Sequence, residues 1–99
     1  MCKRAQALDW NDLRHFLAVS RAGTFAGAGK ELGTPHTTVA RRVAALEAAL
    51  GVKLFARGPD GLTLTDAGRA VLPSAQAMAT HAEEIHRRVA GGDGRVEGS

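Results

Sequence analysis

The stretch from residue 34 to residue 50, TPHTTVARRVAALEAAL, constrains the fold more than any other part of the chain. Its large aliphatic residues recur every three or four positions, which is typical of the buried face of an α-helix; they are Val39, Val43, Leu46 and Leu50. Thr34, Thr37 and Arg41 fall on the opposite side. Thr38 and Arg42 flank them. The sequence therefore predicts an amphipathic helix whose exposed N-terminal half carries hydroxyl and guanidinium groups.

An outward face of this composition fits two interpretations. Hydroxyl and guanidinium groups hydrogen-bond base edges and phosphates, as in a helix whose first turns enter a DNA major groove. A solvated polar face on an ordinary amphipathic helix fits equally well. The elements on either side of the helix decide between them.

Two shorter helices are expected before the central one. The first begins at a cap supplied by Asp9 or Asn11 and runs to about Arg21, followed by a glycine that ends it. The second is capped by Thr24 and ends at Gly33. Both show apolar residues at helical spacing.

The connection to the central helix is very short. Gly33 and Thr34 alone separate the two helices, with Thr34 as the expected cap and Pro35 in the first turn. Two helices joined by a tight turn containing glycine form a helix-turn-helix. Considered by itself, this stretch also fits a plain helical hairpin in a bundle.

A β-hairpin is predicted directly after the central helix. Residues 58–61, GPDG, have the composition of a turn, and residues 62–64 form a return strand. Phe55 is expected to pack inward beneath the hairpin, while Arg57 stands at the edge of the turn, within reach of a phosphate or a minor groove. A hairpin in this position is the wing of a winged helix-turn-helix.

The last predicted element is a long helix that starts at Thr65 and Asp66. Its apolar residues step by four and three, which defines a heptad seam made of Val71, Ala75, Met78, Ala82, Ile85 and Val89. Such a helix is roughly 39 Å long, too long for the preceding residues to cover. We therefore expect a homodimer through this linker helix; a coiled-coil linker without a partner in this chain is the alternative.

These elements define a mainly α fold: a winged helix-turn-helix followed by a long dimerisation helix. The expected organisation is a flexible leader at 1–8, the winged helix-turn-helix DNA-binding domain at 9–65, the linker helix at 66–90 and a flexible tail at 91–99.

Charge permits an anionic partner without requiring one. The formal net charge is +3, and part of the excess lies in and just after the central helix, at Arg41, Arg42, Lys53 and Arg57. Cys2 is the single cysteine, which excludes an intramolecular disulfide and a cysteine-based metal site. No apolar run approaches the about 20 residues of a membrane span, so we expect a cytoplasmic protein with no membrane contact.

The sequence offers no candidate for catalysis, so no enzyme is expected. Ser20 and Ser74 lack the flanking glycines of a nucleophile elbow. His81 and His86 are five residues apart, which does not match the four-residue spacing of a zinc-binding pair. No glycine-rich phosphate loop follows a strand, and we expect neither a metal nor a cofactor.

The run from Leu13 to Gly68 resembles the DNA-binding domain of LysR-type transcriptional regulators. The similarity is carried by LRHFLAVSRAGTF, KELG, TTVARRVAALEAALGVKLFAR and LTLTDAG, in the same order and spacing. The resemblance implies a winged helix-turn-helix with a dimerising linker helix. Such regulators continue into an effector domain, which we expect to be absent from this chain.

The resemblance also implies roles for individual residues. Base-contacting positions fall on His36, Thr37, Ala40 and Arg41, after Thr34 and Pro35 at the start of the helix. Phosphate-contacting positions fall on Thr24, Phe25, Thr38, Arg42 and Arg57. The chain departs from the family at three places. Pro35 and Ala40 stand where serine is usual, and Gly29 replaces a usual alanine, which is expected to loosen the second helix.

The sequence therefore predicts sequence-specific binding of double-stranded DNA by a homodimer. A twofold protein favours an interrupted inverted repeat. Arg41 is the expected guanine contact, and Arg42, Lys53 and Arg57 are expected to supply sequence-independent affinity. The alternative is a winged-helix interaction and oligomerisation module that does not bind DNA, which the outward alanines Ala44, Ala45 and Ala48 would favour.

Overall fold

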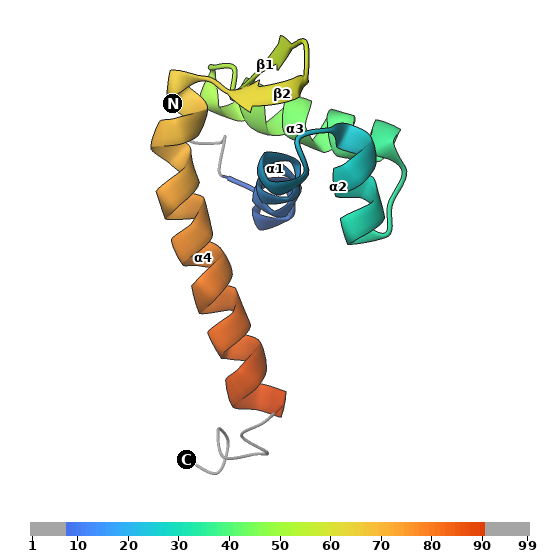
Figure 1. Cartoon of the computed structure of the whole chain (residues 1–99). Helices are drawn as coiled ribbons and strands as arrows, with labels where there is room; N and C mark the ends of the chain where they lie inside the picture. The colour runs from blue at the N-terminus through green and yellow to red at the C-terminus, as the bar shows by residue number, and fades with distance from the viewer. Residues whose placement is uncertain (1–7, 91–99) are drawn as a thin grey trace.

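The computed structural model describes residues 8–90 of the chain. Three helices, a two-stranded antiparallel hairpin and a long last helix follow one another, as predicted (Figure 1). They are α1 (Trp10–Ala22), α2 (Phe25–Leu32), α3 (His36–Leu50), β1 (Phe55–Gly58), β2 (Gly61–Leu64) and α4 (Asp66–Ala90). Apart from residue 8, the expected leader and tail lie outside the described residues.

Caps fix the ends of the first two helices. Asp9 accepts a hydrogen bond from the Asn11 N–H at 2.9 Å, and Thr24 accepts one from the Gly27 N–H at 2.9 Å. Gly23 ends α1 in the left-handed conformation, with φ +80°, which glycine adopts without steric cost. These predicted boundaries are confirmed.

The start of α3 differs from the prediction. Pro35 is the N-cap residue and forms no side-chain cap, while Thr34 lies one position further out. The Thr34 N–H instead donates to the Gly29 carbonyl at 2.9 Å, so its backbone closes the end of α2. The predicted cap at Thr34 is therefore wrong, because this residue belongs to the turn.

The core forms where α1 crosses α3 beneath the hairpin. Phe16 on α1 is fully buried, and its ring centroid lies 5.4 Å from that of Phe55. Two groups of buried apolar residues fill the interior. The first contains Leu13, Phe16, Leu17, Leu46, Leu54 and Ala75, and the second contains Ala18, Val19, Ala28, Val39 and Val43. Of the face predicted for α3, Val39, Val43 and Leu46 are buried and Leu50 is half-buried.

The hairpin is attached to the body near its turn. Its register pairs Phe55 with Leu64 and Gly58 with Gly61. The Leu62 N–H donates to the Gly23 carbonyl at 2.9 Å, which ties β2 to the end of α1. A Cβ on Gly61 would lie 2.8 Å from that same carbonyl, so only glycine permits the close approach.

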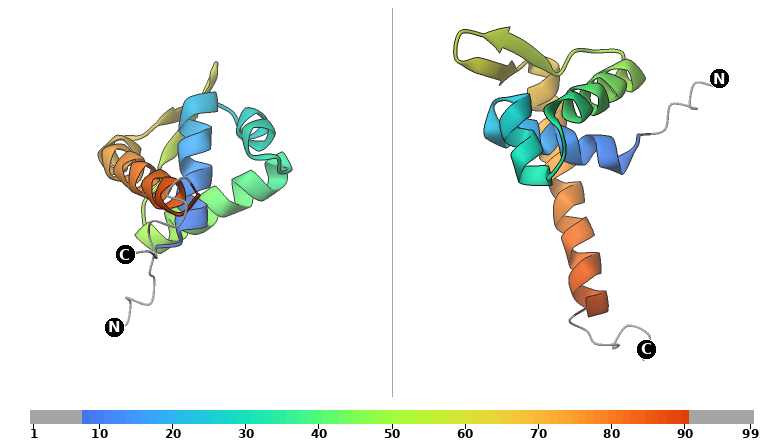
Figure 2. Two further views of the ribbon diagram at one scale, coloured as in Figure 1. Left: turned by 90° about the horizontal axis from the view of Figure 1, so that it is seen from below. Right: turned by 90° about the vertical axis from the view of Figure 1, so that its right-hand side faces the viewer.

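The last helix is anchored through its first turns. Thr65 Oγ1 accepts from the Gly68 N–H at 3.0 Å and donates to the Lys53 carbonyl at 2.6 Å. Gly68 lies so close to the preceding loop that a Cβ would be 2.3 Å from the Leu54 carbonyl oxygen. Seen from below, α1 lies between α4 on one side and α2 on the other, and α3 runs across one end of α1 (Figure 2). From this anchor, α4 continues beyond the body, away from the hairpin (Figure 1).

Candidate nucleic-acid interface

The N-terminal half of α3 presents most of the predicted base-contacting side chains to solvent. His36, Thr37 and Arg41 are exposed, and Ala40 is half-buried. Arg41 makes no ion pair with any residue in the 8–90 range. Its guanidinium therefore keeps all five N–H donors available for an acceptor outside the chain.

The other predicted contacts around the turn divide into two groups. Pro35 and Thr24 are exposed, whereas Thr34 and Thr38 are half-buried. Phe25 is also half-buried, because its side chain packs against the core group that includes Val39. Its backbone N–H lies in the first turn of α2, where such groups have no partner within the helix.

Arg42 does not share the outward orientation of Arg41. Its Nη1 lies 3.3 Å from Oδ1 of Asp12, in the first turn of α1. The expectation that Arg42 points outward beside Arg41 is corrected by this ion pair, since its guanidinium is turned toward its own domain. Sequence spacing alone does not reveal the partner, which lies 30 positions away in the chain.

On the wing, Arg57 is exposed and lies opposite Leu62 in the hairpin register. Lys53 is also exposed, with its Nζ 3.9 Å from Oε1 of Glu47. This separation and the exposure of the lysine make the pair weak, so Lys53 remains available to an anion.

Glu47 has a role that the sequence interpretation missed. Its side chain is largely buried, and its Oε2 accepts a 2.8 Å hydrogen bond from the Leu54 N–H and a 3.4 Å one from the Phe55 N–H. This carboxylate therefore fixes the loop between α3 and the wing. In the sequence, Glu47 stands only as one residue of the run TTVARRVAALEAALGVKLFAR that carries the family resemblance.

Gly29 tightens the helix-turn-helix, contrary to the expectation that it loosens α2. A Cβ at this position would lie 2.4 Å from the Thr34 carbonyl oxygen and 3.4 Å from the His36 nitrogen. Real Cβ atoms do not approach a backbone oxygen so closely, so alanine would push the turn away from α2. In this chain the glycine lets the start of α3 lie directly against α2.

The predicted seam on α4 is divided between two environments. Ala75 is 1% exposed and packs in the core of its own chain, and Val71 and Ala82 are half-buried. Ala75 is therefore corrected from a dimer contact to a core residue, because this part of α4 crosses α1. Met78, Ile85 and Val89 are 41%, 62% and 62% exposed.

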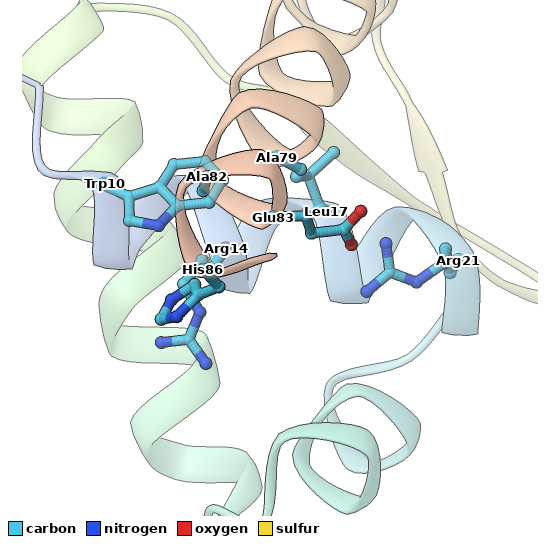
Figure 3. Close-up of a pocket in the computed structure, with 8 residues that line it drawn as sticks. All are labelled: Trp10, Arg14, Leu17, Arg21, Ala79, Ala82, Glu83 and His86. Atoms are coloured by element: carbon cyan, nitrogen blue, oxygen red, sulfur yellow. The ribbon is translucent and has the colours of Figure 1, made fainter. Parts of the chain in front are cut away.

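A shallow hollow of about 250 Å³ marks where α4 leaves the body (Figure 3). Trp10 and Leu17 of α1 and Ala79 and Ala82 of α4 form its apolar part. Charged and polar side chains surround them: Arg14, Arg21, Glu83 and His86. Beyond Ala79 the two helices are therefore not closely packed.

Residues 8–90 contain neither a metal-binding cluster nor a membrane-spanning helix. No group of three or more histidine, cysteine, aspartate or glutamate side chains is arranged to hold a metal ion. None of the helices in this range is both long and apolar enough to cross a bilayer.

The arrangement of a tight helix pair, an adjacent hairpin and a long last helix matches one protein family. Residues 10–69 match the bacterial regulatory helix-turn-helix proteins of the lysR family. The chain belongs to the LysR family. This confirms the resemblance seen in the sequence, and it covers the helix-turn-helix, the wing and the start of α4.

A transcriptional regulator and two solved DNA-binding domains resemble the chain in sequence and in structure. An uncharacterised HTH-type transcriptional regulator of Azotobacter vinelandii, from the ibpB-leuC intergenic region, is 38% identical over 91 residues; the match covers 92% of this chain and 63% of that protein. The DNA-binding domain of CbnR in complex with DNA is 35% identical with a TM-score of 0.75, over 87% of this chain and 99% of that one. The DNA-binding domain of BenM in complex with catB site 1 DNA is 25% identical with a TM-score of 0.75, over 87% and 96%.

Proposed function

We propose that this chain binds double-stranded DNA sequence-specifically as a homodimer and is the DNA-binding module of a LysR-type transcriptional regulator. The observation that carries the proposal is the outward face of α3, where His36, Thr37 and Arg41 are exposed beside an exposed wing. Solved LysR-type domains with the same arrangement are bound to DNA. As a regulator of bacterial genes, the protein would act in the cytoplasm.

In this proposal α3 enters the major groove with its N-terminal turns. Arg41 donates a bidentate pair of hydrogen bonds to a guanine, worth about 1–3 kcal/mol of discrimination against other bases. His36 and Thr37 contact neighbouring base edges, and the Ala40 methyl group meets a thymine methyl. Thr34 and Pro35 set the entry of the helix into the groove.

Sequence-independent affinity comes from contacts to phosphates. Arg57 on the wing and Lys53 at its base carry the positive charges. Thr24, Thr38 and the backbone N–H of Phe25 add neutral donors around the turn. Each charged contact releases condensed counterions, so binding weakens as salt increases.

The second copy is proposed to lie against the exposed apolar stripe of α4, at Met78, Ile85 and Val89. A 25-residue helix leaves these side chains uncovered by its own domain. Two copies paired along this stripe present two α3 helices, and the twofold symmetry matches an interrupted inverted repeat with half-sites about one or more helical turns apart.

The test is a selection of duplexes from a random pool with the 99-residue chain, followed by titration of the selected duplex and a scrambled one. We expect Arg41→Ala to lose about 10- to 100-fold of the preference for the selected duplex. Arg88→Ala, at the exposed far end of α4, is the matched control and should leave the preference unchanged. Failure of the pool to yield any preferred duplex would reject the proposal.

One observation favours the alternative, a winged-helix interaction module. Ala44 and Ala48 on the outer side of α3 and Val52 just after it form a small apolar surface with Glu47 and Lys53 at its edges. If the chain associates with itself but its affinity for duplex DNA is indifferent to salt and to Arg41→Ala, this second function replaces the first.

A further inference from the structure

Asp12 and Arg42 form a contact that DNA binding alone does not explain. Asp12 lies in the first turn of α1, and its side chain is 9% exposed; Arg42 lies in the middle of α3 and is 37% exposed. The Nη1 of Arg42 donates to Oδ1 of Asp12 at 3.3 Å. Among residues 8–90, no other side chain donates a hydrogen bond to this carboxylate.

The burial of Asp12 makes the pair difficult to open. A carboxylate removed from water is strongly destabilised unless it is paired and hydrogen-bonded. If Arg42 turned outward to a DNA phosphate, Asp12 would be left buried without its donor. The guanidinium is therefore held by its own domain.

The pair also restricts the rotation of α3 about its own axis. The contact between α1 and α3 is otherwise made by aliphatic side chains such as Val39, Val43 and Leu46, and packing of this kind is not directional. The Asp12–Arg42 hydrogen bond is directional. Because consecutive helical residues are about 100° apart, holding Arg42 against α1 keeps Arg41 pointing away from the body.

We propose that Asp12 and Arg42 are positioning residues: their ion pair sets the orientation of α3 so that Arg41 meets its base, and Arg42 does not contact a phosphate. This inference rests on the proposed DNA binding. It makes the base contact of Arg41 depend on a residue of α1, outside the helix-turn-helix itself.

The test is a double-mutant cycle with Asp12→Asn, Arg42→Gln and the two changes together, each in the 99-residue chain. Affinity is measured for the selected duplex and for its scrambled counterpart, at a temperature where melting curves show every variant folded. Each single change is expected to lower the ratio of the two affinities by about tenfold. The double variant should lose no more than either single one, because residues that act as a unit are not additive.

Salt dependence separates positioning from direct contact. Affinity falls with salt, so the slope of log affinity against log salt is negative. Loss of one phosphate contact per subunit reduces the magnitude of this slope by about 0.9, hence by about 1.8 for a dimer. We expect the slope of Arg42→Gln to equal that of the wild type, and the slope of Arg57→Gln to become smaller in magnitude. Arg14→Gln on the exposed side of α1 is the control for a general change in charge.

Four results would overturn the inference. A reduced slope for Arg42→Gln would make Arg42 a phosphate contact, and an increased affinity for Asp12→Asn on both duplexes would show that Asp12 merely sequesters it. Equal losses on the two duplexes would show a purely structural role. If Arg41→Ala lowers the preference while the cycle is additive, the positioning role fails and DNA binding stands; if no duplex is preferred by the wild type, the proposed function itself fails.

Discussion

The helices α1 and α4 cross each other, yet they differ in what covers their apolar faces. α1 has 13 residues and buries every position from His15 to Val19. α4 has 25 residues and buries Gly68 and Ala75 alone among its own. The apolar face of α1 is covered by α2, α3, the hairpin and α4, whereas the stripe on the outer half of α4 is open. Amphipathicity thus indicates an apolar face, and the fold shows whether the same chain covers it.

The largest expected difference is between truncations on the two helices. Phe16→Ala removes a fully buried ring that contacts Phe55, and we expect a loss of about 3–5 kcal/mol in the free energy of unfolding. Ile85→Ala, with its side chain 62% exposed, should change the stability of the monomer by less than about 0.5 kcal/mol. Urea unfolding at low protein concentration measures both; equal losses would contradict the contrast.

The open stripe of α4 should respond to charge only through association. Ile85→Glu places a carboxylate twice in a twofold interface, and we expect the dimer dissociation constant to rise about a hundredfold, or about 2.7 kcal/mol. Ala77→Glu, at an exposed position elsewhere on α4, is the matched control. Sedimentation equilibrium gives the constants, and an unchanged constant for Ile85→Glu would place the interface elsewhere.

The anchor of α4 is tested by Gly68→Ala. The added Cβ would lie 2.3 Å from the Leu54 carbonyl oxygen. We expect a net loss of about 1–2 kcal/mol in stability, although alanine has about 1 kcal/mol better helix propensity. Ser74→Ala, exposed on the same helix, should instead stabilise slightly. Thermal unfolding compares the two, and a stabilised Gly68→Ala variant would show that the loop yields easily.

The smallest effect concerns the wing, at the end of the molecule opposite the tip of α4. Arg57→Gln should reduce the magnitude of the slope of log affinity against log salt by about 1.8 for a dimer, and it should leave the preference between duplexes intact. Arg88→Gln near the end of α4 should leave the slope unchanged. Fluorescence anisotropy at several salt concentrations measures both, and a lost preference in Arg57→Gln would make the wing a base contact.

Much of this architecture could be predicted from the chain itself. Capping residues such as Asp9, Thr24 and Thr65 mark helix starts through local hydrogen bonds, and these are visible in a short window of sequence. The aliphatic spacing of α3 specifies its buried face for the same reason. The winged helix-turn-helix follows from these local signals and from the GPDG turn.

The errors concern contacts between distant residues. The helical position of Arg42 beside Arg41 predicts an outward side chain, but Asp12 on another helix supplies a buried partner. Helix propensity predicts that Gly29 loosens α2, but the close approach of the Thr34 carbonyl decides its role. Ala75 follows the heptad spacing, yet α1 covers it. The roles of individual side chains at the α3 surface and on the stripe of α4 stay predictions.

The hydrogen bond from Leu62 to the Gly23 carbonyl has a consequence for the kinetics of recognition. Because this bond and the close packing of Gly61 hold the hairpin to the body, the hairpin loses its conformational freedom when the chain folds. A surface that is already ordered before binding has a smaller conformational-entropy cost when a ligand binds. The hairpin and α3 therefore approach a DNA duplex as one ordered unit, and binding does not require a loop to become ordered first.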